Sequence, residues 1–368
     1  MAGKTEKDTN PAYWREYTNL QHTKHALIKS YLNGWLPKLG SWSGRILYLD
    51  THAGRGRHLS GDYGSPLIAV RTVLDHKYRP TVFGKCDIVY YFVEIDEKNG
   101  AALEQEIKAL GKLPTQIQVN IVVEDCYEVL TKLIDNIKRS KEKLAPAFIF
   151  VDPYGFKVPG KLLRELMEFE RVELFINVMW RQLGMAIAQN DANPGLVETL
   201  NIVFDGDNWR DLIGLEFESQ ARMCTKLLRS MIGARWGTYI RMLGVNNQTR
   251  YMLLHLTNHD AGRDLMKECM WKVSPDKAFV ARASDDPSQQ FLITPEPDLT
   301  PLRHWVLERL SERPRHWQDL INEVRSEIWI QKQLNEIVRQ LRKEKVIDFR
   351  DANRFAMNNN PELFLIRD

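Results

Sequence analysis

Apolar and polar positions follow two different spacings along this chain, and the changes between them mark the expected helices and strands. Between about residues 13 and 39, apolar side chains recur near every 3.6 positions, which predicts an amphipathic helix that ends near Pro37 and Gly40. Beyond this helix, short apolar runs alternate with stretches of helical spacing. Five of the runs predict β-strands, at residues 45–50, 88–93, 117–123, 147–151 and 172–178.

Alternation of strands and helices predicts a doubly wound α/β sheet whose strands are mostly parallel. Two later runs, 238–243 and 250–256, flank a turn-like GVNN segment and predict an antiparallel hairpin that closes the sheet. The Gly-Ser-Pro segment at 64–66 offers Ser65 as an N-cap and a proline at the first helical position. A helix is therefore expected to begin there.

The chain changes character after residue 273. Residues 274–301 contain five prolines and several Asp and Ser residues, which is typical of a linker. Three helical segments and two β-rich runs follow, at 302–310, 317–324, 330–341, 346–349 and 355–366, an outline typical of a winged helix-turn-helix. The predicted organisation is a helical leader (1–40), an α/β domain (41–273), a linker (274–300) and a winged-helix domain (301–368).

Composition narrows the class of protein. With 368 residues, 43% of them hydrophobic and 27% charged, the chain has the make-up of a globular protein of about two domains. It has no run of about 18 apolar residues, and its charged first ten residues predict no secretory signal, so a cytoplasmic location without membrane contact is expected. The four cysteines are scattered and indicate neither a disulfide framework nor a metal site.

The strongest chemical signal follows the first predicted strand. Asp50 precedes the sequence THAGRG, in which Gly54 and Gly56 let the backbone approach a ligand closely, and Ser65 begins the next helix with its unpaired N–H groups. The dinucleotide pattern GxGxxG and the phosphate-binding pattern GxxxxGK[ST] are both absent. An Asp before AGxG is instead the pattern of S-adenosylmethionine sites; the alternative is a tight turn without a ligand.

Acidic residues end each of the first four predicted strands, at the edge where sheets of this kind bind ligands. Glu94 is placed to accept hydrogen bonds from both ribose hydroxyls of an adenosyl group, because a carboxylate is an acceptor only. Asp125 is placed to accept from the adenine amino group, with Cys126 beside the ring, and Glu124 competes for the same role. For each acid the alternative is a solvated charge at a strand end.

A second signal is the turn Asp152-Pro153-Tyr154-Gly155 after the fourth strand. Asp152 beside a carbonyl-rich turn can hold an exocyclic amine so that its lone pair faces an incoming methyl group, while Tyr154 stacks on the base. A methyl group on cationic sulfur needs no metal for its transfer, and in-line geometry supplies most of the catalysis. The alternative is a turn that Pro153 stabilises after a strand.

Other residues near the expected site have two interpretations each. His52 and Lys24 are candidates for the methionine end of the cofactor, although a lysine on a leading helix is usually solvated. Arg55 and Arg57 flank the expected opening of the pocket. They would either contact phosphates or be solvent-exposed residues of a surface loop. The segment Trp180–Arg181 is a candidate substrate platform, with a packed tryptophan and a capping arginine as the preferred alternative.

Taken together, the segments YLDTHAGRG (48–56), GSPL (64–67), FVDPYG (150–155) and FIN (175–177) resemble the three-Cys-motif partner protein family, often written TcmP. The resemblance runs from about residue 23 to residue 273. It implies a Rossmann-like class I methyltransferase that uses S-adenosylmethionine and has a separate radical-SAM-like three-Cys-motif protein as its partner. This chain has no CxxxCxxC, so it corresponds to the partner and not to the iron–sulfur protein.

The first motif is also similar to that of ribosomal-RNA adenine N6-methyltransferases of the YLDTHAGxGRY type, which implies an RNA amine as acceptor. Amino-methyltransferases usually have Asp/Asn-Pro-Pro-Tyr/Phe, whereas this chain has one proline fewer after Asp152. Two functions therefore stay open. The first is a methyltransferase that acts on nucleic acid, RNA in preference to DNA, at an exocyclic base amine, and the second is a catalytically inactive subunit that scaffolds the three-Cys-motif protein.

The predicted site contains no metal. Its catalytic residues are Asp152, Pro153 and Tyr154, and its cofactor-binding residues are Asp50, His52, Gly54, Gly56, Ser65, Glu94 and Asp125. The whole chain has 51 Lys and Arg and 48 Asp and Glu, so its net charge of only +3 requires any nucleic-acid contact to come from local patches. Residues 301–368 contain 13 Lys and Arg and 11 Asp and Glu and are therefore only modestly basic. The basic residues of the expected recognition helix are Lys332, Arg339, Arg342, Lys343 and Lys345, and either nucleic acid or a protein is a possible ligand for it.

Overall fold

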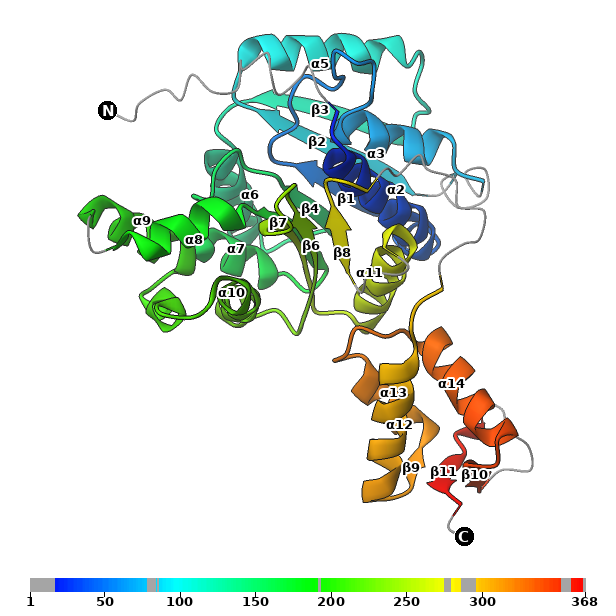
Figure 1. Cartoon of the computed structure of the whole chain (residues 1–368). Helices are drawn as coiled ribbons and strands as arrows, with labels where there is room; N and C mark the ends of the chain where they lie inside the picture. Colours follow the sequence, from blue (N-terminus) through cyan, green and yellow to red (C-terminus); the bar gives the residue numbers. More distant parts are fainter. Residues whose placement is uncertain are drawn as a thin grey trace. The chain divides into compact units, whose positions relative to one another are not determined.

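The computed structural model describes residues 17–77, 84, 86–190, 193–274, 279–285, 296–351 and 359–366. The chain divides into two compact units (Figure 1). The first consists of Met1–Cys269 with Val280–Gln289, and the second of Met270–Phe279 with Gln290–Asp368. None of the helices in the described part of the chain has both the length and the apolar character that a membrane span requires.

The first unit is built on an eight-stranded sheet with the order β3-β2-β1-β4-β5-β7-β6-β8. Its strands are β1 (Arg45–Asp50), β2 (Asp87–Glu94), β3 (Ile117–Val123), β4 (Ala147–Val151), β5 (Val172–Val178), β6 (Trp236–Leu243), β7 (Thr249–Thr257) and β8 (Val280–Arg282). The five predicted parallel strands and the closing hairpin are confirmed, because β1 to β5 pair in parallel and β7 pairs antiparallel with both β5 and β6. This mostly parallel sheet fits a Rossmann-like, doubly wound α/β fold.

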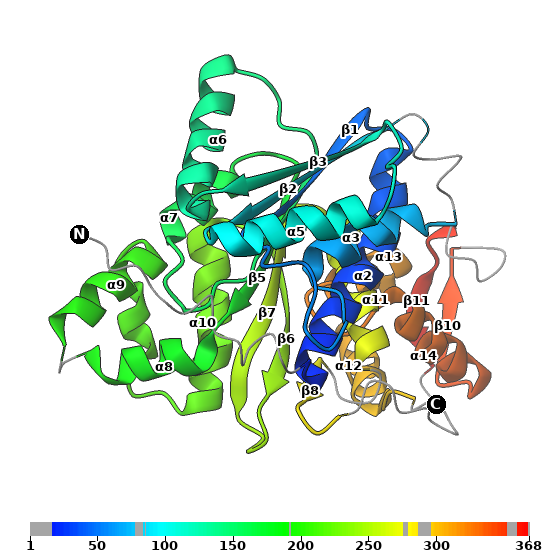
Figure 2. The same cartoon turned by 90° about the horizontal axis from the view of Figure 1, so that it is seen from above.

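Helices cover both faces of the sheet, and Figure 2 shows α6, α7 and α10 on one face with α2 and α3 on the other. The strands β4 and β5 are buried along their whole length, which explains why their sequences are almost continuously apolar. The helices of this unit are α2 (Asn19–Gly40), α3 (Ser65–Leu74), α5 (Glu97–Ala109), α6 (Cys126–Ser140), α7 (Gly160–Met167), α8 (Trp180–Ala188), α9 (Pro194–Phe204), the 3₁₀ helix η3 (Asn208–Leu212) and α10 (Phe217–Ile232), with α11 (Asp260–Val273) reaching the unit boundary.

The predicted leader is part of the first unit and not a separate segment. A capping box between Thr18 and Gln21 begins α2, and the helix includes Pro37 and ends at Gly40, as predicted. Its apolar face is fully buried, and the Tyr31 ring lies 5.1 Å from that of Phe148 in β4. The part of the predicted helix at residues 13–16 lies outside the described residues.

The predicted linker, 274–300, is partly wrong. Within it, β8 pairs in parallel with β6 along Arg241–Leu243, so residues 280–282 extend the sheet. Val280 and Ala281 are buried there, which explains why this short apolar stretch sits between proline-containing segments. The prolines at 275, 287 and 295 lie outside the described residues.

The second unit contains the three predicted helices and a small sheet. Its elements are α12 (Thr300–Glu312), β9 (Arg315–His316), α13 (Trp317–Val324), α14 (Gln331–Lys343), β10 (Ile347–Arg350) and β11 (Glu362–Leu365). The strands form an antiparallel sheet in the order β10-β11-β9, and Leu302, Trp317, Leu334 and Leu363 belong to one buried apolar cluster. The two-residue strand β9 was not predicted, and the start of the predicted strand 355–366 lies outside the described residues.

Candidate functional site

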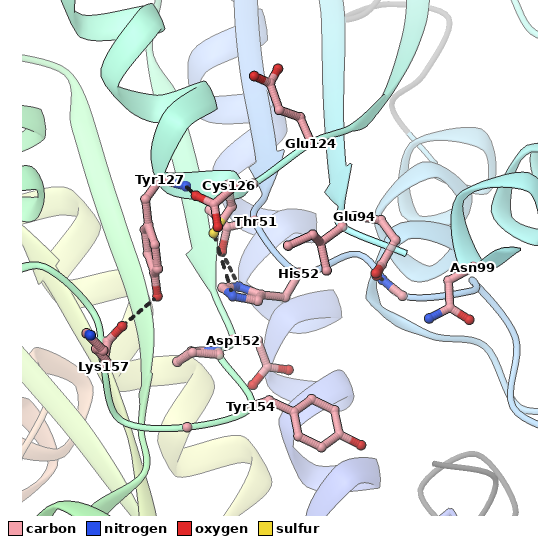
Figure 3. Close-up of a pocket in the computed structure, with 15 residues that line it drawn as sticks. Thr51, His52, Glu94, Asn99, Glu124, Cys126, Tyr127, Asp152, Tyr154 and Lys157 are labelled. Carbon is pink, nitrogen blue, oxygen red and sulfur yellow. Dashed lines mark hydrogen bonds between the residues drawn. The ribbon is translucent and has the colours of Figure 1, made fainter. Parts of the chain in front are cut away.

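An open pocket of about 230 Å³ lies at the carboxyl ends of β1, β2, β3 and β4, where ligands of doubly wound sheets bind (Figure 3). Of the ten predicted site residues, seven line this pocket: His52, Gly54, Glu94, Asp125, Asp152, Pro153 and Tyr154. The other predicted residues, Asp50, Gly56 and Ser65, are not among its lining residues. Lining residues that were not predicted include Thr51, Ile95, Asn99, Tyr127 and Lys157.

Glycines shape the loop after β1. Gly54 and Gly56 have φ values of +64° and +84°, in the region where a side chain is strained. A Cβ on Gly56 would come within 2.8 Å of the Leu103 side chain of α5, so the absence of a side chain at Gly56 lets the loop pack closely against this helix. Gly54, in contrast, lies in the pocket wall, where the lack of a side chain exposes its backbone to a ligand.

Glu94 at the end of β2 is held by the backbone on both sides. Its Oε2 accepts a hydrogen bond from the Gly54 N–H at 2.7 Å, and its Oε1 accepts from the Asp96 N–H at 2.9 Å. The residue is only 5% exposed, yet it lines the pocket beside Ile95, which is 60% exposed. Because an ionised carboxylate only accepts hydrogen bonds, Glu94 presents acceptor oxygens in a fixed orientation at the pocket.

Asp125 and Glu124 follow β3 and have different surroundings. The Oδ1 of Asp125 caps α6 by accepting from the Tyr127 and Glu128 N–H groups at 2.9 and 3.1 Å. Glu124 forms an ion pair with Lys132. Both residues line the pocket, and the Cys126 Sγ lies there 3.6 Å from the His52 Nε2.

His52 forms the wall between Asp125 and Asp152. Burial lowers the pKa of its imidazole to about 4, although the negative charges of Asp152 and Asp125 oppose this shift. The ring is therefore neutral at pH 7, with its Nδ1 2.7 Å from the Thr51 hydroxyl. The Tyr127 ring lies edge-on to it at 6.3 Å, and the Tyr127 hydroxyl donates to the Lys157 carbonyl across the pocket (Figure 3).

Asp50 lies behind the loop and is fully buried. It accepts hydrogen bonds from the Ser65 hydroxyl at 2.6 Å and from the His52 N–H at 3.2 Å. The predicted N-cap is corrected, because Gly64 is the N-cap of α3 and Ser65 is its first helical residue. Asp50 and Ser65 thus join the glycine loop to the start of α3 and shape the pocket from behind.

The burial of Asp50 predicts a pH-dependent stability. Desolvation raises the pKa of its carboxyl to about 7. The folded state therefore holds this proton more tightly than the unfolded state, and the contribution of Asp50 to the free energy of unfolding falls as the pH rises from about 4 to about 7. Between pH 5 and pH 8, the free energy of unfolding of wild type relative to Asp50→Asn should fall by about 2–3 kcal/mol. Denaturant unfolding at both pH values checks this, and an equal difference at both would contradict it.

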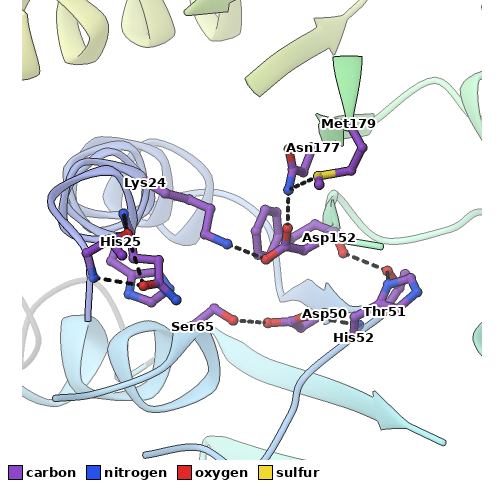
Figure 4. A network of polar contacts seen from close by, with 12 residues as sticks. Lys24, His25, Asp50, Thr51, His52, Ser65, Asp152, Asn177 and Met179 are labelled. Carbon is purple, nitrogen blue, oxygen red and sulfur yellow. Dashed lines mark hydrogen bonds and ion pairs between the residues drawn. The ribbon is translucent and has the colours of Figure 1, made fainter. Parts of the chain in front are cut away.

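The turn after β4 has two partners that bind its carboxylate. Lys24 Nζ lies 2.5 Å from the Asp152 Oδ2, and the Asn177 side chain donates to the Asp152 Oδ1 at 2.6 Å (Figure 4). Pro153 is buried in the pocket wall, whereas Tyr154 is 41% exposed at its rim. The turn therefore combines a fixed carboxylate with an accessible aromatic ring.

From the sequence, Lys24 was a candidate for the methionine end of the cofactor, with a solvated lysine as the usual case, and no contact with Asp152 was predicted for Lys24 or Asn177. The structure places both against Asp152 and not among the pocket-lining residues. A signal for Lys24 existed, because it lies seven positions before Tyr31 on the buried face of α2. Its partner, 128 residues away, could not be identified from local sequence.

The remaining candidates have mainly structural contacts. Arg57 forms an ion pair with Glu106 at 2.9 Å and stacks on the Tyr63 ring, so it holds the loop in place. Trp180 is fully buried with its ring 5.5 Å from that of Phe217, which confirms the packed-tryptophan alternative, while Arg181 is exposed. Arg55 is half-buried and is not a lining residue. Within the described residues, no group of three His, Cys, Asp or Glu side chains is arranged to hold a metal ion.

No protein-family model and no curated protein matches this sequence. Among similar solved structures, Trm1 from Pyrococcus horikoshii in complex with S-adenosyl-L-methionine is 11% identical over 72% of this chain, with a TM-score of 0.40, and the chain spans 62% of the length of that protein. Magnesium protoporphyrin IX methyltransferase from Synechocystis with bound SAH is 10% identical over 70% of this chain and 90% of its own, with a TM-score of 0.34. A SAM-dependent methyltransferase from Agrobacterium tumefaciens is 13% identical over 62% and 61%, with a TM-score of 0.30. These likenesses do not assign a family or a substrate.

Proposed function

We propose that this protein is an S-adenosylmethionine-dependent methyltransferase that acts on a nucleic acid, at an exocyclic amine of an RNA base. The observation that carries the proposal is the presence, in one pocket, of a backbone-held carboxylate at the end of β2 and a fixed carboxylate in the turn after β4. Glu94 supplies the first and Asp152 the second. A methyl transfer needs one end of the pocket to hold the donor and the other to hold the acceptor in line with it.

The residues on the Glu94 side fit an adenosyl group. Glu94 presents a carboxylate, which is a suitable acceptor for ribose hydroxyls, and Gly54 lets the ligand approach the backbone. The exposed Ile95 side chain offers an apolar surface to a purine, and Asp125 supplies a carboxylate oxygen for its amino group. S-adenosylmethionine, when bound, would supply an activated methyl group on cationic sulfur.

The residues on the Asp152 side fit an amine on a planar base. Lys24 and Asn177 each occupy one acceptor position on a different oxygen of Asp152, so both oxygens keep capacity for an amine N–H. The Tyr154 ring at the rim is accessible for stacking, and the exposed Lys157 lies at the same edge for a phosphate. RNA is preferred to DNA because of the similarity of the glycine motif to that of ribosomal-RNA adenine methyltransferases.

The second unit would bind the nucleic acid as a winged helix, with α14 as its recognition helix. The helix buries its apolar face and leaves Lys332, Arg339 and Lys343 exposed, followed by the exposed Lys345. Arg342 stacks instead on the Phe349 ring at 4.5 Å, which fixes the start of the hairpin to the helix. The exposed Glu336 lies between Lys332 and Arg339 in the helix and partly compensates this charge. The exposed lysine and arginine side chains are the candidate phosphate contacts of α14.

Neutralising α14 should therefore weaken RNA binding in a salt-dependent way. We expect the triple variant Lys332→Gln/Arg339→Gln/Lys343→Gln to lower the slope of log affinity against log salt by about 2, because each lost phosphate contact on a single strand contributes about 0.7. Binding of total cellular RNA is measured between low and physiological salt. A control with the same net charge replaces three exposed lysines of the first unit by glutamine: Lys98, Lys112 and Lys143. Equal slopes for the two triple variants would assign the tail to protein docking.

A second function is favoured by one specific feature, the single proline in Asp152-Pro153-Tyr154. In this alternative the pocket binds the cofactor without transferring its methyl group, and the protein scaffolds a radical-SAM-like three-Cys-motif partner, as the resemblance to the TcmP family implies. Mass spectrometry of nucleosides from RNA and DNA of cells with and without the gene separates the two. The enzyme requires one methylated nucleoside to disappear with the gene, and the scaffold requires none to change.

A further inference from the structure

The contact between Lys24 and Asp152 joins the first described helix to the acceptor side of the pocket. The two side chains are only 5% and 14% exposed, and their charged atoms are 2.5 Å apart. A lysine buried this deeply needs an anionic partner, because an unpaired ammonium group is strongly disfavoured away from water. Lys24 and Asp152 therefore hold one another in place.

The same face of α2 is attached to the sheet at a second acid. Tyr31 and Trp35 lie seven and eleven positions after Lys24, which places all three on one side of the helix. The Trp35 indole donates to the Glu173 Oε1 at 3.0 Å, and the Tyr31 hydroxyl hydrogen-bonds to the Glu173 Oε2, which also lies 2.8 Å from the His255 Nε2. Glu173 is near the start of β5 and is buried.

The distance between the two attachment points is similar along the helix and along the strand. From Lys24 to Tyr31 the helix rises by about 10 Å, at 1.5 Å per residue. Asn177, the other partner of Asp152, is four residues after Glu173 along β5, a distance of about 13 Å at 3.3 Å per residue. Tyr31 and Trp35 thus lie near the start of β5, and Lys24 lies near its carboxyl end. The Glu173 contacts fix the position of the helix along this strand.

The Glu173 contacts attach α2 to the sheet. The Lys24 contact, in addition, affects the pocket. It fixes a carboxylate that lines the pocket, although Lys24 itself is not a lining residue (Figure 4). Asn177 and Lys24 approach the two oxygens of Asp152 from different elements, β5 and α2, which restricts rotation of the carboxylate. The orientation of the Asp152 carboxylate is therefore fixed, and with it the direction of the acceptor positions that remain on its oxygens.

We propose that Lys24 is a positioning residue for Asp152, and that α2 is part of the acceptor half of the site. The inference rests on the proposed methyl-transfer function. Lys24 orients the carboxylate and keeps its negative charge compensated, and Asp152 in turn binds the acceptor amine. The cofactor half of the pocket, around Glu94 and Gly54, does not depend on this contact.

The test compares Lys24→Met, which keeps the aliphatic stem without the charge, with Lys24→Arg, Asp152→Asn and the double variant Lys24→Met/Asp152→Asn. The matched control is Lys29→Met, an exposed lysine of the same helix. Initial rates are measured with methyl-labelled S-adenosylmethionine at saturating total RNA from cells that lack the gene. Calorimetry with S-adenosylhomocysteine and thermal denaturation are run on the same variants.

We expect Lys24→Met to lower the rate on the order of tenfold or more, with the Kd for S-adenosylhomocysteine within about twofold of wild type. The double variant should be no slower than the slower single variant, because both changes disrupt one unit. Lys24→Arg should retain more activity than Lys24→Met, and if Lys24→Met does not fold, Lys24→Arg alone should still lower the rate without changing the Kd. Lys29→Met should match wild type.

Three outcomes would overturn the inference. A Lys24→Met variant that melts at a lower temperature but transfers methyl groups at the wild-type rate has lost only a structural contact. A loss in Kd as large as the loss in rate would assign Lys24 to the cofactor. In both cases the proposed function stands, whereas a wild-type protein that transfers no label although it binds S-adenosylhomocysteine would refute the proposed function and this inference together.

Discussion

Replacing Asp152 with asparagine is expected to lower methyl transfer by a factor on the order of 10² or more while leaving cofactor affinity nearly unchanged. Asparagine keeps the size of the side chain but exchanges one acceptor oxygen for a donor nitrogen, so an amine can no longer be held between two carboxylate oxygens. The loss falls on the reacting acceptor and therefore on the rate and not on cofactor binding. Label transfer and calorimetry on the same preparation measure the two quantities.

Asparagine is a better test here than alanine. Both variants remove the negative charge that compensates the buried Lys24 ammonium. Asparagine keeps one amide oxygen that accepts a hydrogen bond from the ammonium, whereas alanine removes both oxygens and leaves Lys24 without an acceptor at this position. Tyr154 supplies an internal comparison, since Tyr154→Phe keeps the stacking ring and should be milder than Tyr154→Ala. If Asp152→Asn transfers methyl groups as well as wild type, the acceptor site lies elsewhere, and the segments 55–58 and 177–181 become the next candidates.

Replacing Glu94 with alanine is expected to weaken binding of S-adenosylmethionine and S-adenosylhomocysteine by about 1–3 kcal/mol, or roughly 5- to 150-fold. The carboxylate is buried and fixed by the Gly54 and Asp96 N–H groups, so its loss removes two acceptors for ribose hydroxyls and leaves two backbone donors unpaired. Isothermal calorimetry with both ligands measures the change.

Two further variants distinguish a loss of ligand contacts at Glu94 from local unfolding around it. Glu94→Gln keeps one acceptor oxygen and should lie between wild type and Glu94→Ala. Glu97→Ala removes an exposed carboxylate three residues away and should leave affinity unchanged. Unchanged affinity in Glu94→Ala, with a fold that melts as wild type does, would move the ribose-binding role to Asp96.

The sheet could be predicted from sequence because its strands are short, buried and bounded by polar residues. The limits of β1, β3, β4 and β5 agree with the apolar runs that predicted them. For β4 and β5 the reason is burial of both faces, which leaves little room for polar side chains inside a parallel strand. Two short strands were missed. β8 has three residues and β9 has two, and each depends on pairing with a distant strand and not on local pattern.

The candidate site was predicted in part, for a related reason. Glu94, Asp125 and Asp152 follow directly from their positions at strand ends, because parallel strands deliver their carboxyl ends to one edge. The direction in which a side chain near a loop points cannot be predicted from the local sequence alone. Asp50 and Ser65 flank the glycine motif, but they hydrogen-bond to each other behind the loop and do not line the pocket. The contact of Lys24 with Asp152 was not predicted, because it forms only when the helix packs on the sheet.

The central claim, that this pocket transfers a methyl group from S-adenosylmethionine to RNA, is tested most directly by following labelled methyl groups. Purified wild-type protein and Asp152→Asn are each incubated with labelled S-adenosylmethionine and with total RNA from cells that lack the gene, after calorimetry has established cofactor binding by both. Label in RNA with the wild type, reduced on the order of 10² or more with Asp152→Asn, is the predicted result. Wild-type protein that binds the cofactor and leaves the RNA unlabelled, with and without a three-Cys-motif partner, would contradict the claim.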